Sequence, residues 1–223
     1  MSNHLLAVLI SGGLDSAILL GDALRRNLTV TPIYIRCGLA WESVERLYLE
    51  RYLDVLACPA LKPLVMLDQP IADVYGPHWS ITGEDAPVIG TPEEAVFLPG
   101  RNVLLLAKSL LWCHLQGVPA LALGSLQTNP FPDATPEFFN GFQELVNQAM
   151  QGKVEVCLPF GGMKKAAVMA LGKSLPLEYT FSCVAPVAAL HCGRCSKCGE
   201  RRDAFADAGM ADPTRYFVKT GST

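Results

Sequence analysis

The first residues of the chain that could do chemistry interrupt an apolar run, in AVLISGGLDSAILL at residues 7–20. Residues 5–10 are apolar and too few for a helix, which predicts a buried strand, whereas the apolar residues after Ser16 recur at helical spacing. The polar stretch therefore joins a strand to a helix. At such a junction the first N–H groups of the helix lack partners, and glycines let a ligand approach closely. The junction predicts a phosphate site.

The composition of this loop extends the prediction to a metal ion. The loop consists of Ile10, Ser11, Gly12, Gly13, Leu14, Asp15 and Ser16. The Asp15 carboxylate would repel a phosphate unless a divalent cation lay between them, so we expect Mg²⁺ at this site. The alternative is an ordinary glycine turn in which Asp15 or Ser16 caps the helix. The loop has neither the lysine of a Walker A sequence nor the G-x-G-x-x-G dinucleotide pattern.

A second group of reactive residues lies near the end of the chain, in SCVAPVAALHCGRCSKC. It contains Cys183, Cys192, Cys195 and Cys198, whose spacing predicts a closed tetrahedral Zn²⁺ site with a structural role. An iron–sulfur cluster and a thioredoxin-like redox pair are the alternatives. His191 adjoins the cluster, and we expect it to be a bystander. The other four cysteines, Cys37, Cys58, Cys113 and Cys157, are isolated and are predicted to be buried as small apolar side chains.

The overall composition favours a globular protein. The chain has 223 residues, of which 50% are hydrophobic and 17% charged, with a net charge of −3. These values predict a packed core and do not favour a broad basic face for duplex nucleic acid or an anionic membrane. The most apolar helical run, residues 103–115, is too short to span a bilayer. The N-terminus lacks the basic start of a secretory signal, so we expect a soluble cytoplasmic protein.

Strand and helix patterns alternate along the chain. The predicted strands are residues 5–10, 30–35, 64–67, 120–124 and 154–160, and the predicted helices after the first are residues 41–57, 102–116, 136–150 and one beginning near residue 163. This order predicts an α/β fold with a doubly wound, mainly parallel sheet and ligands at the carboxyl ends of its strands. The proline-rich segment 70–100 is predicted to form a site wall or a lid. We expect residues 1–179 to form an ATP-binding domain and residues 180–223 a small zinc-binding subdomain.

The motifs together are similar to those of a known family. A Ser-Gly-Gly-x-Asp-Ser loop that opens an α/β domain resembles the PP-loop ATPases, which bind ATP and mostly adenylate a substrate. With FLPGRN at residues 97–102, FPDATPEFF at residues 131–139, and the cysteine cluster followed by Arg201, the chain resembles the QueC family of queuosine precursor synthesis. The resemblance implies that 7-carboxy-7-deazaguanine is adenylated, that ammonia displaces AMP to give an amide, and that a second ATP drives dehydration to a nitrile.

The resemblance also implies roles for individual residues. The loop from Ser11 to Ser16 would hold the nucleotide phosphates, and Lys165 would steady phosphate charge unless it is a solvated lysine at a helix start. Arg101 would pair with phosphate or substrate, or anchor its loop to a helix. Asp133 would bind the edge of the base, although Pro-Asp is equally typical of a turn.

Three departures from the family pattern fall in its substrate-binding segments. Residues 35–41 read IRCGLAW where the family usually has His-Tyr-Gly-Gln and a nearby histidine. Asn129 stands in place of an aspartate, and Ala134 and Thr135 stand in place of cysteine and arginine. These changes remove a charge, a thiol and a guanidinium. They predict that the acid is still activated but that the nitrile forms slowly or not at all.

The leading hypothesis is therefore an ATP-dependent carbon–nitrogen ligase that uses ATP, Mg²⁺ and one structural Zn²⁺ per chain. Its partners would be a small carboxylic acid and ammonia or another amine, with a homodimer left open. One alternative is a related ligase that transfers an acyl group to a protein or a nucleic acid. Another is a nucleotide-regulated binding module whose zinc knuckle carries basic residues, although such charges usually form a solvated face. These basic residues are Arg194, Lys197, Arg201 and Arg202.

Overall fold

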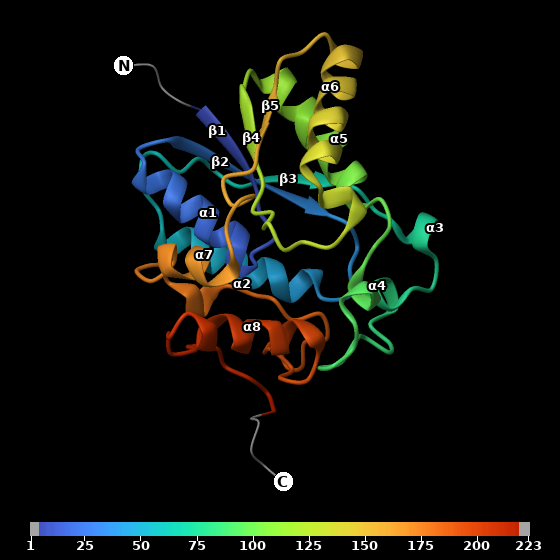
Figure 1. Cartoon of the computed structure of the whole chain (residues 1–223), viewed down its shortest axis with the longest axis vertical. Helices are drawn as coiled ribbons and strands as arrows, with labels where there is room; N and C mark the ends of the chain where they lie inside the picture. The colour runs from blue at the N-terminus through green and yellow to red at the C-terminus, as the bar shows by residue number, and fades with distance from the viewer. Residues whose placement is uncertain (1–4, 219–223) are drawn as a thin grey trace.

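The computed structural model describes residues 5–218 and centres on a five-stranded parallel sheet (Figure 1). Its strands are β1 (Leu5–Leu9), β2 (Thr29–Arg36), β3 (Val65–Asp68), β4 (Ala120–Ala122) and β5 (Glu155–Cys157). They are arranged in the order β3-β2-β1-β4-β5, and all four neighbouring pairs are parallel. The chain therefore winds outward from β1 in both directions, as the alternation of elements predicts.

Helices cover both faces of this sheet. The longer ones are α1 (Leu14–Arg25), α2 (Glu42–Val55), α5 (Arg101–Gln116), α6 (Pro136–Met150), α7 (Lys165–Leu171) and α8 (Ser196–Asp207). Alternate residues of β1 enter two separate cores, because side chains alternate across a strand. Ala7 belongs to the core that includes α5 and α6, whereas Val8 belongs to the core that includes α1 and α7. The predicted doubly wound architecture is confirmed.

Three regions differ from the sequence-based expectation. The last strand is shorter than predicted, because the N–H of Gly161 bonds back to the carbonyl of Leu158 in a turn. Segment 70–100 contains α3 (Ala72–Tyr75), α4 (Trp79–Thr82) and the 3₁₀ helix η1 (Glu93–Val96). Helix α8 was not predicted, because its buried face is made of Cys198, Arg201, Ala204 and Phe205, which is not an apolar helical pattern.

The strand order places the junction after β1 at the point where the sheet reverses direction. β1 pairs with β2 on one side and with β4 on the other, so the loops that leave β1 and β4 diverge at the carboxyl edge. A crevice at such a switch point is the usual ligand site of a doubly wound sheet. Gly124, just after β4, lies so close to α1 that an added Cβ would be 3.0 Å from the carbonyl carbon of Asp15. The absence of a side chain there allows the two loops to meet.

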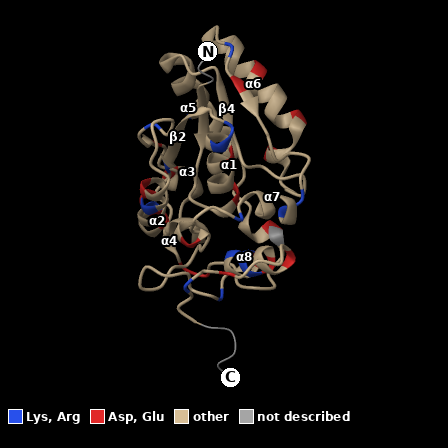
Figure 2. Ribbon diagram, turned by 90° about the vertical axis from the view of Figure 1, so that its left-hand side faces the viewer, with Lys and Arg blue, Asp and Glu red and all other residues tan. Residues whose placement is uncertain are grey.

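The C-terminal region lies at the end of the molecule away from the N-terminus, below the carboxyl edge of the sheet (Figure 1). Segment 70–100 is attached to it: the N–H of Ile89 donates to the carbonyl of Arg194 at 3.0 Å, and the N–H of Ser196 donates to that of Pro87 at 2.9 Å. Acidic and basic residues both gather around α8 (Figure 2). Within residues 5–218, the helices are too short or too polar to cross a membrane.

Candidate active site

A cavity of about 700 Å³ opens at the switch point of the sheet. Its lining comes from the loops after β1 and β4, from β2 and the start of α2, from the starts of α5 and α7, from α6 and residues 181–184, and from one face of α8. The sequence-predicted residues found in this lining are Ile10, Ser11, Gly13, Leu14, Asp15, Ser16, Arg101, Asn129 and Lys165. Segments that lie far apart in the sequence, such as Asp15 and Lys165 at a separation of 150 residues, therefore converge on one cavity. Gly12 and Asp133 lie outside the lining.

The loop after β1 is ordered by its own serine hydroxyls. Ser16 Oγ donates to the carbonyl of Gly13 at 3.2 Å and accepts from the N–H of Ser11 at 3.2 Å. Gly12 has φ +76°, a left-handed conformation that favours glycine. The N-cap of α1 is Gly13, and no side chain caps the helix, so the interpretation of Asp15 or Ser16 as an ordinary cap is wrong. The uncapped N-terminus of α1 can accept an anion from the cavity.

Asp15 and Lys165 form an ion pair at the mouth of this loop. Lys165 Nζ lies 2.6 Å from Asp15 Oδ1, and the two side chains are 31% and 30% exposed. Asp15 lies in the first turn of α1 and Lys165 is the first residue of α7, so two helix N-termini meet here. The pair offers one group for a cation and one for an anion. A metal–phosphate ligand can therefore replace both halves of this contact at once.

Glu45 and Tyr34 also line the cavity, and the sequence analysis missed both. The Tyr34 hydroxyl donates to Glu45 Oε2 at 2.6 Å, and the two residues are only 2% and 7% exposed. Burial raises the pKa of the Glu45 carboxyl to about 7, although hydrogen bonds from Tyr34 and Trp41 and the charge of Arg101 oppose the shift. No motif marks Glu45, because a glutamate in an amphipathic helix is ordinarily solvated.

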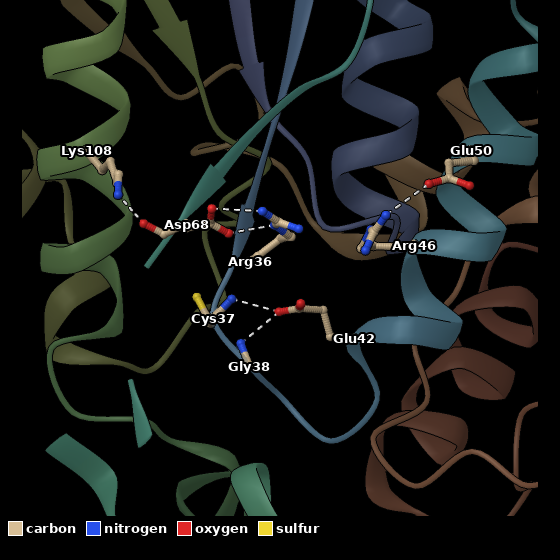
Figure 3. A network of polar contacts seen from close by, with 8 residues as sticks. All are labelled: Arg36, Cys37, Gly38, Glu42, Arg46, Glu50, Asp68 and Lys108. Carbon is tan, nitrogen blue, oxygen red and sulfur yellow. Dashed lines mark hydrogen bonds and ion pairs between the residues drawn. The ribbon is translucent and has the colours of Figure 1, made fainter. Parts of the chain in front are cut away.

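The segment that departs from the family pattern, residues 35–41, is held by a carboxylate (Figure 3). Glu42 Oε2 accepts the backbone N–H groups of Cys37 and Gly38 at 2.7 and 2.8 Å. The turn brings Leu39 and Trp41 into the cavity lining.

Contacts on either side support this turn. Before it, Arg36 forms an ion pair with Asp68 at 2.6 Å, and Lys108 donates to the backbone carbonyl of Asp68 (Figure 3). After it, the Trp41 ring stacks on Trp79 with centroids 5.8 Å apart. The cavity lining resumes only at Arg101, so segment 70–100 supports the wall from behind and does not form it.

Asp133 organises the neighbouring wall. Its carboxylate accepts the N–H of Asn102 at 3.0 Å, and its backbone carbonyl accepts the Asn102 side-chain amide at 2.9 Å. Asp133 is 8% exposed, so this contact is a buried cap on the first turn of α5. It positions Arg101, which lies one residue earlier and lines the cavity. Asn129 uses its side-chain oxygen to accept the N–H of Phe131 at 3.1 Å.

The four clustered cysteines have the geometry of a metal site. Cys183, Cys192, Cys195 and Cys198 are buried, and their sulfur atoms all lie within 4.8 Å of one another. Two of the sulfur–sulfur distances are 3.8 and 3.9 Å, far longer than a disulfide bond. A tetrahedron with metal–sulfur bonds of about 2.3 Å has edges of about 3.8 Å, so these thiols fit a tetrahedral ion. Cys183 Sγ also accepts N–H groups from Ala185 and Cys192 at 3.4 and 3.3 Å, which favours a thiolate.

The cysteine cluster is connected to the loop after β1 through residues 181–183. The N–H of Phe181 donates to the carbonyl of Gly12 at 2.7 Å, two residues before the ligand-site cysteine Cys183. Arg201 holds the same segment of the chain, because its guanidinium donates to Ser182 Oγ at 3.2 Å and to the carbonyl of Leu177 at 3.0 Å. Whatever orders the cysteine cluster therefore also positions the back of the β1 loop.

Two expectations for this region were wrong. Arg201 is only 2% exposed and does not belong to a solvated basic face, because its guanidinium is bonded within the fold. Cys58 is exposed and is not part of a core. The Nε2 atom of His191 accepts the N–H of Ser182 at 3.2 Å, so this nitrogen is used within the fold, as expected for a residue that is not a metal ligand. Burial and the charge of Arg201 lower the pKa of His191 to about 3, which keeps this imidazole neutral.

Comparisons with known proteins agree with this geometry. The model of the family described as "Queuosine biosynthesis protein QueC" matches residues 6–209. The chain belongs to the QueC family. Among curated QueC relatives, the 7-cyano-7-deazaguanine synthase of Solidesulfovibrio magneticus is 33% identical over 94% of each chain. That of Saccharophagus degradans is 32% identical over 97% of this chain and 99% of the relative.

A solved structure supports the same fold at low sequence identity. It is described as a predicted subunit of tRNA methyltransferase from Methanocaldococcus jannaschii, and it aligns with a TM-score of 0.51 at 14% identity. The alignment covers 97% of this chain and 93% of that one. The predicted fold class is therefore confirmed: a doubly wound parallel sheet, with a cluster of four cysteines near its C-terminal end that can hold a metal ion.

The first prediction concerns the cysteine cluster. Replacing Cys195→Ser removes one of four thiolates, so we expect the bound metal to fall from one ion per chain to a small fraction, measured by elemental analysis. Because Cys183 and Phe181 brace the β1 loop, nucleotide-induced thermal stabilisation should fall too. The exposed Cys58→Ser variant is the matched control and should change neither. Full metal content in the Cys195→Ser variant would contradict the assignment of Cys195 as a ligand.

The second prediction concerns the pH dependence of stability. Burial raises the pKa of Glu45 from its ordinary 4.5 to about 7, so the folded protein favours the neutral carboxyl. The associated stability is fully present below pH 4.5 and is lost as the pH rises through 7. We therefore expect the effect of Glu45→Gln on the free energy of unfolding of the ligand-free protein to be more stabilising at pH 8 than at pH 5. The two effects should differ by about 3 kcal/mol at most. Urea unfolding of both proteins at each pH tests this, and a pH-independent difference would contradict it.

Proposed function

We propose that this chain is an ATP-dependent carbon–nitrogen ligase of the 7-cyano-7-deazaguanine synthase type. Its acid substrate would be 7-carboxy-7-deazaguanine, activated as an acyl-adenylate. The observation that carries the proposal is the uncapped loop after β1, whose Asp15–Lys165 pair opens onto a cavity of about 700 Å³. A cavity of this size has room for a nucleotide beside a small planar acid. The name of the QueC relatives supplies the deazaguanine chemistry.

The nucleotide would bind at the N-termini of α1 and α7. N–H groups in the first turn of α1 would receive phosphate oxygens, and Ser16 would donate its hydroxyl after leaving the Gly13 carbonyl. Lys165 would move from Asp15 to a phosphate oxygen. The residues fit a magnesium ion, because the Asp15 carboxylate is an oxygen ligand next to a phosphate site. When bound, Mg²⁺ would offset the negative charge that develops on departing pyrophosphate.

The acid would lie on the Arg101 side of the same cavity. A carboxylate oxygen of the acid attacks the α-phosphate of ATP, and pyrophosphate leaves to give the acyl-adenylate. Ammonia then displaces AMP and forms the amide. Arg101 can pair with the anionic acid or with the phosphate, since its guanidinium is available to the cavity and its position is set by the Asp133 cap. Asn129, which lines the cavity, is proposed as a residue that contacts the substrate, and Asp133 is proposed to act on the substrate through the position of Arg101.

The cysteine cluster would hold one structural zinc ion. Four sulfur donors at tetrahedral distances match zinc and leave no open position for catalysis. We propose that this ion keeps residues 180–223 together as a small subdomain beside the ATP-binding region of residues 1–179. Of these two regions, residues 219–223 and residues 1–4 lie outside the part of the chain that the structure describes. Its effect on the reaction would be indirect, through the contact between Phe181 and Gly12.

The third prediction is the set of reaction products. With ATP, Mg²⁺, ammonium and 7-carboxy-7-deazaguanine, we expect AMP, pyrophosphate and the 7-amido product by mass spectrometry. The nitrile should form more slowly, because Thr135 cannot supply a bidentate guanidinium and its hydroxyl instead caps α6 by accepting the N–H of Phe138 at 3.1 Å. Fast, complete conversion to the nitrile would refute the slow second step. Absence of AMP with this acid would refute the substrate.

The fourth prediction tests the role of Asp15. The Asp15→Asn variant should lose at least about a hundredfold in acid-dependent AMP formation, because an amide is a poor ligand for Mg²⁺ and forms no ion pair with Lys165. Its thermal stability should change little, since Asp15 is part-exposed and is not the helix cap. Asp22→Asn, in the same helix and paired only with arginines at the surface, is the matched control. Normal turnover in the Asp15→Asn variant would reject the metal-binding role.

A further inference from the structure

Glu45 is a buried carboxylate that faces the cavity without an ion-pair partner. It is 7% exposed, and among residues 5–218 none of the ion pairs involves it. Tyr34 and Trp41 each donate one hydrogen bond to it, which leaves further acceptor capacity on the carboxylate. A buried anion of this kind is costly unless a cation or several donors neutralise it. The missing partner is most simply a cation that enters the cavity.

The position of Glu45 limits what that cation can be. A Cβ added to Gly12 would lie 3.7 Å from Glu45 Cγ and 3.6 Å from its backbone carbonyl, so Glu45 sits directly behind the nucleotide loop. Under the proposed function, the activated carbon of the acid is joined to the α-phosphate through an oxygen atom and would lie on this side of the cavity. The guanine-like edge of the base is at the opposite end of the ring system. Glu45 is therefore nearer to the reacting carbon than to that edge.

Aromatic and apolar side chains make up much of the surroundings of Glu45, together with the charges of Arg101 and Glu42. Trp41 lines the same part of the cavity and is backed by the stacked ring of Trp79, while Leu49 packs behind the loop. One carboxylate with a phenol and an indole is a poor site for Mg²⁺, which requires several oxygen ligands. It suits a small ammonium-type cation, because such an ion donates N–H groups to the carboxylate and the carboxylate neutralises its charge.

We propose that Glu45, Tyr34 and Trp41 form the site at which an ammonium ion binds and loses a proton before it attacks the activated acid. This proposal rests on the proposed function. The carboxylate accepts one proton from ammonium, which leaves neutral ammonia and a neutral carboxyl. The nitrogen lone pair forms a bond to the acyl carbon, and the bond from that carbon to AMP oxygen breaks. A second proton passes from nitrogen to the phosphate of departing AMP.

The electrostatics of the site suit this proton transfer. The charged and titratable groups acting on Glu45 are Tyr34 from β2, Arg101 from the start of α5 and Glu42 from its own helix. Burial raises the pKa of Glu45 to about 7, so the group exchanges a proton near neutral pH. The Tyr34 hydroxyl fixes one carboxylate oxygen and remains protonated, because burial raises its pKa further above the ordinary value. Tyr34 is a positioning residue.

The fifth prediction separates ammonium use from activation of the acid. In Glu45→Gln, acid-dependent exchange of pyrophosphate into ATP should stay within about twofold of the wild type. The KM for ammonium should rise roughly tenfold to a hundredfold, the loss expected for a charge-assisted contact. Transfer to hydroxylamine, which is already neutral near pH 7, should be preserved. Glu50→Gln, an exposed carboxylate on the same helix, should behave as wild type in all three assays.

Specific outcomes would overturn the ammonium site. Equal losses with ammonium and hydroxylamine would make Glu45 a residue for binding the acid or for folding. A normal ammonium KM in Glu45→Gln would show that the carboxylate is not used. If the glutamine variant does not fold, Glu45→Asp retains the charge, retracts it by one methylene, and should raise the ammonium KM while sparing hydroxylamine.

A binding measurement distinguishes failure of this site from failure of the proposed function. The latter would appear as no acid-dependent pyrophosphate exchange in the wild type. Titration of wild-type tryptophan fluorescence with ammonium chloride should still saturate through Trp41, whereas sodium chloride should have no such effect. The response should disappear in Glu45→Gln. A response that is identical in the two proteins would refute the site independently of any turnover.

Discussion

The hydrogen bond from the N–H of Phe181 to the carbonyl of Gly12 links the two parts of the molecule on which its chemistry depends. Gly12 stands at the left-handed turn of the β1 loop, where a shift of the peptide would redirect every N–H group that follows. Phe181 lies two residues before Cys183, the first member of the cysteine cluster. The loop is therefore held from outside by a segment that is itself anchored by the cluster.

Two further contacts constrain the same loop from other directions. Gly124 at the end of β4 approaches the backbone of Asp15, and the start of α2 packs against Gly12 through Glu45 and its neighbours. Each contact comes from a different element, and each is made at or near a backbone atom. A phosphate site built from N–H groups needs this kind of support, because donors that move with the ligand lose the benefit of preorganisation. These contacts from the surrounding fold add to the serine hydrogen bonds that order the loop from within.

The motifs allowed the sequence to predict the sheet, the β1 loop and the cysteine cluster, since each depends on local spacing. Parallel strands and βα junctions leave strong patterns, and four cysteines within a short stretch leave few geometric choices. Glu45 could not be found in this way. Its importance comes from Tyr34, eleven residues earlier, and from a cavity wall formed by β2 and α2 together. Helix α8 was missed for a related reason, because its buried face contains Arg201 where a core residue is expected.

Arg201 and Glu45 illustrate how burial separates structural charge from functional charge in this protein. Burial lowers the pKa of Arg201, yet its guanidinium donates to the Leu177 carbonyl and the Ser182 hydroxyl, so its desolvation is offset within the fold. Glu45 has hydrogen bonds from Tyr34 and Trp41 and also lines the cavity, so its desolvation is only partly offset. A group left in that state lowers the stability of the free protein and gains most from a ligand of opposite charge. The difference lies in the partners each charge has, and it makes Arg201 a brace for the β1 loop and Glu45 a residue poised for chemistry.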